Sequence, residues 1–136
     1  MKEICEIKFP PEVKFSEDHE WISKSAPYRI GISDYAQDAL GDLTFAEMPE
    51  IGTVLTKGGE FGTLESTKSV SPLLSPINGK VVSINDELNN DPGVANRDPY
   101  GDGWIVEVEL DDPDQQLGCL MDAADYKKFI EDQSDK

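Results

Sequence analysis

Residues 62–82 read GTLESTKSVSPLLSPINGKVV, and their pattern indicates two strands joined by a turn. A strand-like alternation leads towards Lys68, Ser75-Pro76 ends the return, and Asn78-Gly79 suits a type I′ turn into the next strand. We therefore expect a β-hairpin with Lys68 at or near its tip, where an amine is exposed, hydrated and accessible to an acylating enzyme. On spacing alone, a plain surface charge is the commoner role for such a lysine, so both interpretations stay open here.

Short strands separated by turn residues continue on both sides of this hairpin. We predict strands over residues 28–32, 43–48, 61–65, 80–85 and 104–110. Short strands at this spacing are typical of an antiparallel sandwich or barrel, so the predicted fold class is mainly β. The period of two places Leu43 and Phe45 on one face of their strand. It likewise places Phe61, Thr63 and Glu65 on one face of theirs.

One short helix interrupts the strands near residues 33–41. Ser33 is a candidate N-cap, and Gly41 follows the last turn, where glycine often ends a helix. Helical spacing predicts a buried stripe of Tyr35, Ala36, Ala39 and Leu40.

A second helix is predicted near the C-terminus, over residues 121–132, with Asp122 as its N-cap. Its apolar stripe is Tyr126, Phe129 and Ile130. The acidic residues 111–116 are expected to form a linker into this helix. No domain boundary is visible, so we expect a single domain over residues 1–136 with its core at about 15–131.

The formal net charge of the chain is −16 at pH 7. So acidic a chain lacks the basic surface that nucleic acid binding needs, and it favours protein partners with basic patches. Alternatively, the charge only maintains solubility. The sequence has no apolar run typical of a membrane span and no secretory signal, so we expect a cytoplasmic protein. His19, the single histidine, leaves no pattern for a metal site and is interpreted as a polar residue beside a packed Trp.

Five segments match a known family in order and spacing. They are EDHEWI (17–22), GISDYAQDALGDLTFAEMPEIG (31–52), ESTKSVSPLLSP (65–76), GKVVSIN (79–85) and DPYGDGWIVEVE (98–109). From Phe15 to about Glu131, the chain closely resembles the glycine cleavage system H protein family of lipoyl carriers. The ES-x-K-x-x-S-x-L-x-SP pattern around Lys68 is specific, and it differs from the motifs of other lipoyl and biotinyl carriers.

The resemblance implies a barrel-sandwich hybrid fold (lipoyl/biotinyl-carrier-like) in which lipoate is joined by an amide to Lys68. It also implies that the three preceding residues, Glu65, Ser66 and Thr67, belong to the cofactor-binding motif. Matching family positions line a cleft for the aminomethyl-lipoyl arm, and here they are Glu20, Asp18 and Tyr35. From the residues alone, Glu20 is interpreted as a surface charge before a core Trp, and its place in the cleft rests on the resemblance.

By resemblance, the protein is a non-catalytic carrier subunit, because the cofactor supplies the chemistry and the scaffold positions it. Its expected partners are a pyridoxal-phosphate glycine decarboxylase, an aminomethyltransferase and dihydrolipoyl dehydrogenase. A lipoate ligase or lipoyl transferase would attach the cofactor. The carrier itself is expected to be a monomer.

One residue departs from the family pattern. Members typically read Ser-Asp-Leu after the lysine, whereas this chain has Ser71-Pro72-Leu73. The proline removes a carboxylate that would help to hold an amine. It therefore favours an alternative, an H-like lipoate-binding protein that serves another pathway, such as heterodisulfide-reductase-like sulfur oxidation. A third hypothesis is an unmodified β domain that acts as a binding adaptor.

Overall fold

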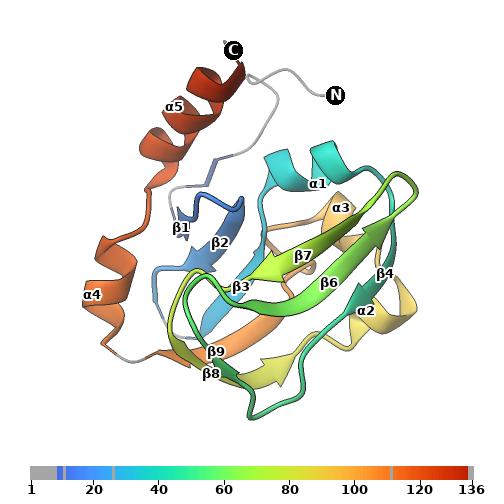
Figure 1. The fold of residues 1–136 in the computed structure, drawn as a ribbon, viewed down its shortest axis with the longest axis horizontal. Coiled ribbons are helices and arrows are strands. Elements are labelled where there is room, and N and C mark those ends of the chain that lie inside the picture. The colour runs from blue at the N-terminus through green and yellow to red at the C-terminus, as the bar shows by residue number, and fades with distance from the viewer. Residues whose placement is uncertain (1–8, 11, 26, 111, 135–136) are drawn as a thin grey trace.

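The computed structural model describes residues 9–10, 12–25, 27–110 and 112–134 of the chain. Nine antiparallel strands form two facing sheets in this part of the chain (Figure 1). The larger sheet has the order β1 (Val13–Phe15), β2 (Glu20–Ser23), β3 (Tyr28–Ile32), β9 (Val106–Leu110), β8 (Gly79–Ile84) and β5 (Val54–Leu55). The smaller sheet has the order β4 (Leu43–Glu47), β6 (Glu60–Ser66) and β7 (Val70–Leu74).

Five helices occur in the described residues, mostly where the chain passes between strands. They are α1 (Asp34–Leu40), α2 (Glu87–Asn90), α3 (Val94–Arg97), α4 (Pro113–Gly118) and α5 (Ala123–Ser134). None of the helices is long and apolar enough to span a membrane, as far as the described residues go.

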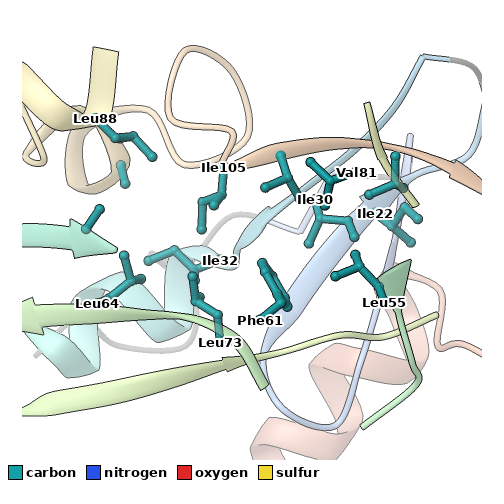
Figure 2. Packing of buried hydrophobic residues seen from close by; sticks show 14 of the residues in the cluster. Ile22, Ile30, Ile32, Leu55, Phe61, Leu64, Leu73, Val81, Leu88 and Ile105 are labelled. Carbon is teal, nitrogen blue, oxygen red and sulfur yellow. The ribbon is translucent and has the colours of Figure 1, made fainter. Parts of the chain in front are cut away.

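The main core lies between the two sheets, as Figure 2 shows. The larger sheet contributes Ile22, Ile30 and Val81, and the smaller sheet contributes Phe61, Leu64 and Leu73; all six are buried. Removing this much apolar surface from water is the dominant favourable term in folding. It also gives the β6–β7 hairpin a rigid base.

A second cluster packs α5 against the first two strands. Phe15 of β1 and Tyr126 of α5 are both fully buried, and their rings stack with centroids 4.3 Å apart. Ile130, one turn further along α5, is also fully buried. The C-terminal helix is therefore part of the folded body.

The predicted strands and both predicted helices are present. Ser33 caps α1, because its Oγ accepts the Ala36 N–H at 3.1 Å, and Gly41 ends that helix with φ 79°. Asp122 caps α5 through a bond from the Asp125 N–H to its Oδ1, at 2.9 Å. Four residues that are expected to form a linker, 113–116, instead lie in α4, which begins at Pro113 because proline is favourable at the first position of a helix.

The alternation of residues predicted the wrong face for Phe45 and for Phe61, each of which lies at a shift in strand register. The β4–β6 register shifts between Leu43 and Phe45, so Phe45 turns outward and is 49% exposed. The β6–β7 register shifts between Glu60 and Gly62, so Phe61 points into the core rather than sharing a face with Thr63. A β-bulge of this kind adds one residue to one strand, and a period-two pattern cannot foresee it.

Two further expectations were wrong. The Asn78-Gly79 pair is not a type I′ turn, because Gly79 has no positive φ and instead begins β8. A side chain at Gly79 would collide with the Glu109 carbonyl oxygen, which explains the glycine by close backbone approach. In α1 the buried residues are Asp34 and Gln37, whereas the predicted apolar stripe faces an open pocket.

Candidate functional site

Lys68 lies at the tip of the β6–β7 hairpin and is exposed. The tip is a tight turn in which the Ser66 N–H donates to the Ser69 carbonyl at 2.8 Å. The Ser66 hydroxyl accepts the N–H groups of Lys68 at 3.2 Å and of Ser69 at 3.1 Å. The turn is anchored from outside by the Thr67 N–H, which donates to the Asp42 carbonyl at 3.2 Å. A serine hydroxyl thus organises the backbone that presents the amine.

The Lys68 side chain runs along the end of α1. A Cβ built at Gly41 would lie 3.2 Å from Lys68 Cε and 3.6 Å from Nζ, so the glycine leaves room for the lysine stem. The Gly41 carbonyl is held by Asn96 Nδ2, which donates to it at 2.8 Å. No ion pair engages Lys68 within the described part of the chain. In Figure 1 the hairpin projects beside this end of α1.

A pocket of about 200 Å³ opens between α1, β7 and the residues around the start of β2. Its lining includes Leu40, the residue before Gly41, and Ser71, three residues after Lys68. Apolar side chains such as Leu64 and Leu73 make up much of the wall. Another pocket, of about 230 Å³, is lined by Lys57 and Cys119 among others but by no residue of the hairpin tip. We therefore take the pocket beside α1 as the candidate site.

The three residues predicted for the cleft, two of them acidic, meet in this pocket. Asp18, Glu20 and Tyr35 all line it, whereas Glu65, Ser66 and Thr67 belong to the hairpin. Pro72 lines the pocket too, from the exposed edge of the small sheet, so this wall position carries no carboxylate.

Glu20 is a buried carboxyl, with an exposed fraction of 3%. Its Oε2 accepts the Leu74 N–H at 2.9 Å, whereas Oε1 has no hydrogen-bond partner. Burial raises the pKa of Glu20 well above its usual range, against the lowering effect of the Leu74 hydrogen bond and with a smaller raising effect from Asp18. A buried, half-satisfied carboxyl in a pocket is prepared to receive a hydrogen-bond donor or a cation.

Sequence reasoning missed two residues at this site. His19 lines the pocket with its ring centroid 4.8 Å from that of Tyr35, and it had been interpreted only as a polar residue beside a Trp. Gly41 had been interpreted only as a helix end, although it also adjoins the Lys68 stem. His19 lies between Asp18 and Glu20 in the sequence, and this position between two predicted cleft residues could have indicated that it lines the pocket. The contact with Gly41 depends on the tertiary fold.

Comparison with known proteins agrees with this site. The family model described as "Glycine cleavage H-protein" matches residues 13–133. The chain is 44% identical over 128 residues to the glycine cleavage system H protein of Anaeromyxobacter sp. (strain K), covering 93% of this chain and 99% of that one. It is 45% identical over 123 residues to that of Myxococcus xanthus (strain DK1622), covering 90% and 95%.

A solved structure is similar in fold. The crystal structure of a glycine cleavage system H protein from Mycobacterium marinum superposes with a TM-score of 0.81 and 36% sequence identity, covering 90% of this chain and 98% of that one. This similarity confirms the barrel-sandwich hybrid fold. From the family model and these relatives, the chain belongs to the glycine cleavage H-protein family, the non-catalytic lipoyl carriers of the glycine cleavage system.

Proposed function

We propose that Lys68 is the residue of this chain to which lipoate is attached. The observation that carries the proposal is an exposed amine at the tip of a rigid hairpin, with its stem against Gly41 and without an ion pair among the described residues. An acylating enzyme needs an accessible and flexible lysine, which this position offers. Glu65, Ser66 and Thr67 would complete the recognised motif, because Ser66 orders the turn and Thr67 anchors it.

The pocket beside α1 fits an acyl arm that carries a cation. Its apolar wall, including Leu64 and Leu73, suits a hydrocarbon chain, and the unpartnered Oε1 of Glu20 supplies a buried acceptor. When bound, lipoate supplies a disulfide that accepts the aminomethyl group of glycine. The protein's own part is to exclude water and to place carboxylates where an ammonium group would lie.

We infer separate roles for the three cleft residues. Glu20 would accept a hydrogen bond from the ammonium group at Oε1, and its Oε2 bond to the Leu74 N–H keeps the carboxyl oriented. Asp18, at the exposed edge of the pocket, would add negative charge. Tyr35 would cover the arm from α1.

The proposed partners follow from membership of the glycine cleavage system. They are glycine decarboxylase, the aminomethyltransferase, dihydrolipoyl dehydrogenase and, for attachment, a lipoate ligase or lipoyl transferase, all in the cytoplasm. A net charge of −16 favours docking to basic surfaces on these enzymes. Tethering keeps the arm at high effective concentration near each enzyme. The relatives are glycine cleavage proteins, which favours this pathway over sulfur oxidation.

Intact mass spectrometry after coexpression with lipoate ligase and lipoate tests the attachment. We expect one lipoyl amide on the wild-type chain and none on Lys68→Arg, which keeps the charge and the fold. Lys57→Arg and Lys80→Arg are matched controls, because both lysines are exposed but lie outside the hairpin tip. An unmodified wild-type chain in the presence of an active ligase would support the adaptor hypothesis, and a modified Lys68→Arg chain would place the lipoate elsewhere.

Glycine-dependent exchange of labelled carbon dioxide then tests the pathway. The lipoylated chain with a competent glycine decarboxylase should support exchange into the glycine carboxyl group. If lipoylation is complete but exchange is absent, the carrier serves another pathway.

A further inference from the structure

Tyr126, in the C-terminal helix, reaches the wall of the arm pocket. It is fully buried, and its hydroxyl lies 2.7 Å from Ser33 Oγ and 2.9 Å from His19 Nδ1. Ser33 caps α1, whose side chains Tyr35 and Leu40 line the pocket. One hydroxyl therefore joins three segments that are distant in sequence: α5, the start of α1 and the residues before β2.

The two hydrogen bonds that link Ser33, Tyr126 and His19 have a preferred donor-to-acceptor direction. Ser33 Oγ already accepts the Ala36 N–H at 3.1 Å, and Ser33 is fully buried. Its own proton needs an acceptor, and the Tyr126 oxygen is the one found for it in the described residues. The Tyr126 proton is then directed to His19 Nδ1. In the opposite direction, the Ser33 proton would be buried without an acceptor.

His19 is held in place by its backbone as well. Its φ is 68°, a left-handed value that is uncommon for residues other than glycine. Its N–H donates to the Ser16 carbonyl at 3.1 Å, and its carbonyl accepts the Ser33 N–H at 2.9 Å. Burial lowers the pKa of His19, against a smaller raising effect from Asp18, which is consistent with a neutral ring.

We propose that Tyr126 is a positioning residue for the arm pocket, because its hydroxyl holds His19 as the neutral Nε2–H tautomer in the pocket wall. Because the His19 ring is neutral, there is no imidazolium cation beside Asp18 and Glu20. A bound ammonium group therefore meets no competing positive charge from His19. The role in holding cargo rests on the proposed carrier function. The tautomer itself does not depend on lipoylation.

Nitrogen NMR of the unlipoylated chain labelled with ¹⁵N-histidine tests the tautomer. His19 is the single histidine, so its two ring signals need no further assignment. At neutral pH we expect Nε2 to give the signal of a protonated nitrogen and Nδ1 that of an unprotonated, hydrogen-bonded nitrogen. A protonated Nδ1 in the wild-type chain would overturn the proposal, whatever the variants do.

Two variants separate positioning from general packing. Tyr126→Phe removes the donor to Nδ1, and we expect the ratio of the tautomers to shift by about fivefold, the effect of one net hydrogen bond. Tyr100→Phe is the matched control, because the hydroxyl of the partly buried Tyr100 accepts the Asp34 N–H at 2.9 Å, also at the start of α1. The control should keep the wild-type spectrum. An unchanged spectrum in Tyr126→Phe would overturn the proposal.

The lipoylated chain, charged by glycine decarboxylase, tests the consequence for cargo. We expect Tyr126→Phe to lose its bound amine faster than the wild-type chain, and Tyr100→Phe to lose it at the wild-type rate. Equal rates in all three would remove the positioning role. Failure of lipoylation at Lys68 would instead contradict the proposed function and leave the NMR result intact.

Discussion

Replacing Glu20 by glutamine should make the protein more stable at neutral pH and a poorer carrier. Glutamine keeps an oxygen to accept the Leu74 N–H, so the bond observed at 2.9 Å survives. The variant loses the charge of a side chain that is 3% exposed, whereas the unpartnered Oε1 becomes an amide nitrogen whose N–H groups also lack an acceptor there. A buried acceptor without a partner costs about 1–3 kcal/mol, and more when it is charged. An unpaired amide in the same place has a cost of its own within this range, so only the excess cost of the charge is relieved, and we expect the free energy of unfolding to rise by about 1 kcal/mol above pH 7.

The difference in the free energy of unfolding between Glu20→Gln and the wild type should change with pH in a defined direction. Burial raises the pKa of Glu20 in the folded state, so the folded state binds this proton more tightly than the unfolded state does. Wild-type stability therefore falls as pH rises from the ordinary carboxyl pKa through the raised folded value. The glutamine variant has no such proton, so its advantage should shrink as the pH falls towards the ordinary carboxyl pKa, near 4.3.

Urea unfolding at several pH values measures this difference. Glu17→Gln is the matched control, because Glu17 is exposed and lies in the same segment, so it reports the general effect of losing one negative charge. A Glu20→Gln protein that is less stable than the wild type above pH 7, or whose advantage does not vary with pH, would refute the reasoning. Faster loss of the amine from its lipoylated form would show that the stability was given up for function.

Two other substitutions test the hairpin and the pocket. Gly41→Ala should lower the free energy of unfolding by about 1–3 kcal/mol, because φ 79° with ψ −163° is a conformation essentially restricted to glycine. Urea unfolding measures this, with Gly118→Ala as a control that has no atom within 4 Å of the added Cβ and should be nearly neutral or slightly stabilising. Pro72→Asp should slow the loss of amine from the charged carrier, because it adds a carboxylate to a pocket wall that includes Glu20. An unchanged rate of release would show that position 72 does not hold the cargo.

Local patterns were sufficient where neighbouring residues decide the conformation. The caps of α1 and α5 depend on Ser33 and Asp122, each of which binds a backbone N–H within three residues of itself. The hairpin around Lys68 was predicted from the alternation of residues 61–65 and from Ser75-Pro76, whereas the type I′ turn expected at Asn78-Gly79 is absent, and Ser66 orders the tip locally. Local patterns failed at Phe45, where a register shift between strands decides which face the side chain occupies.

Local residue patterns were enough to predict the mainly β class, the family and an exposed lysine on a hairpin, because these depend on short-range periodicity and a specific motif. The packing of the folded chain buries Glu20 with one oxygen unpartnered and places Gly41 beside the Lys68 stem. It alone brought Tyr126 to His19, 107 residues away in the chain. The physical reason is that burial and hydrogen bonding are set by which segments pack together, and that information is spread over the whole chain.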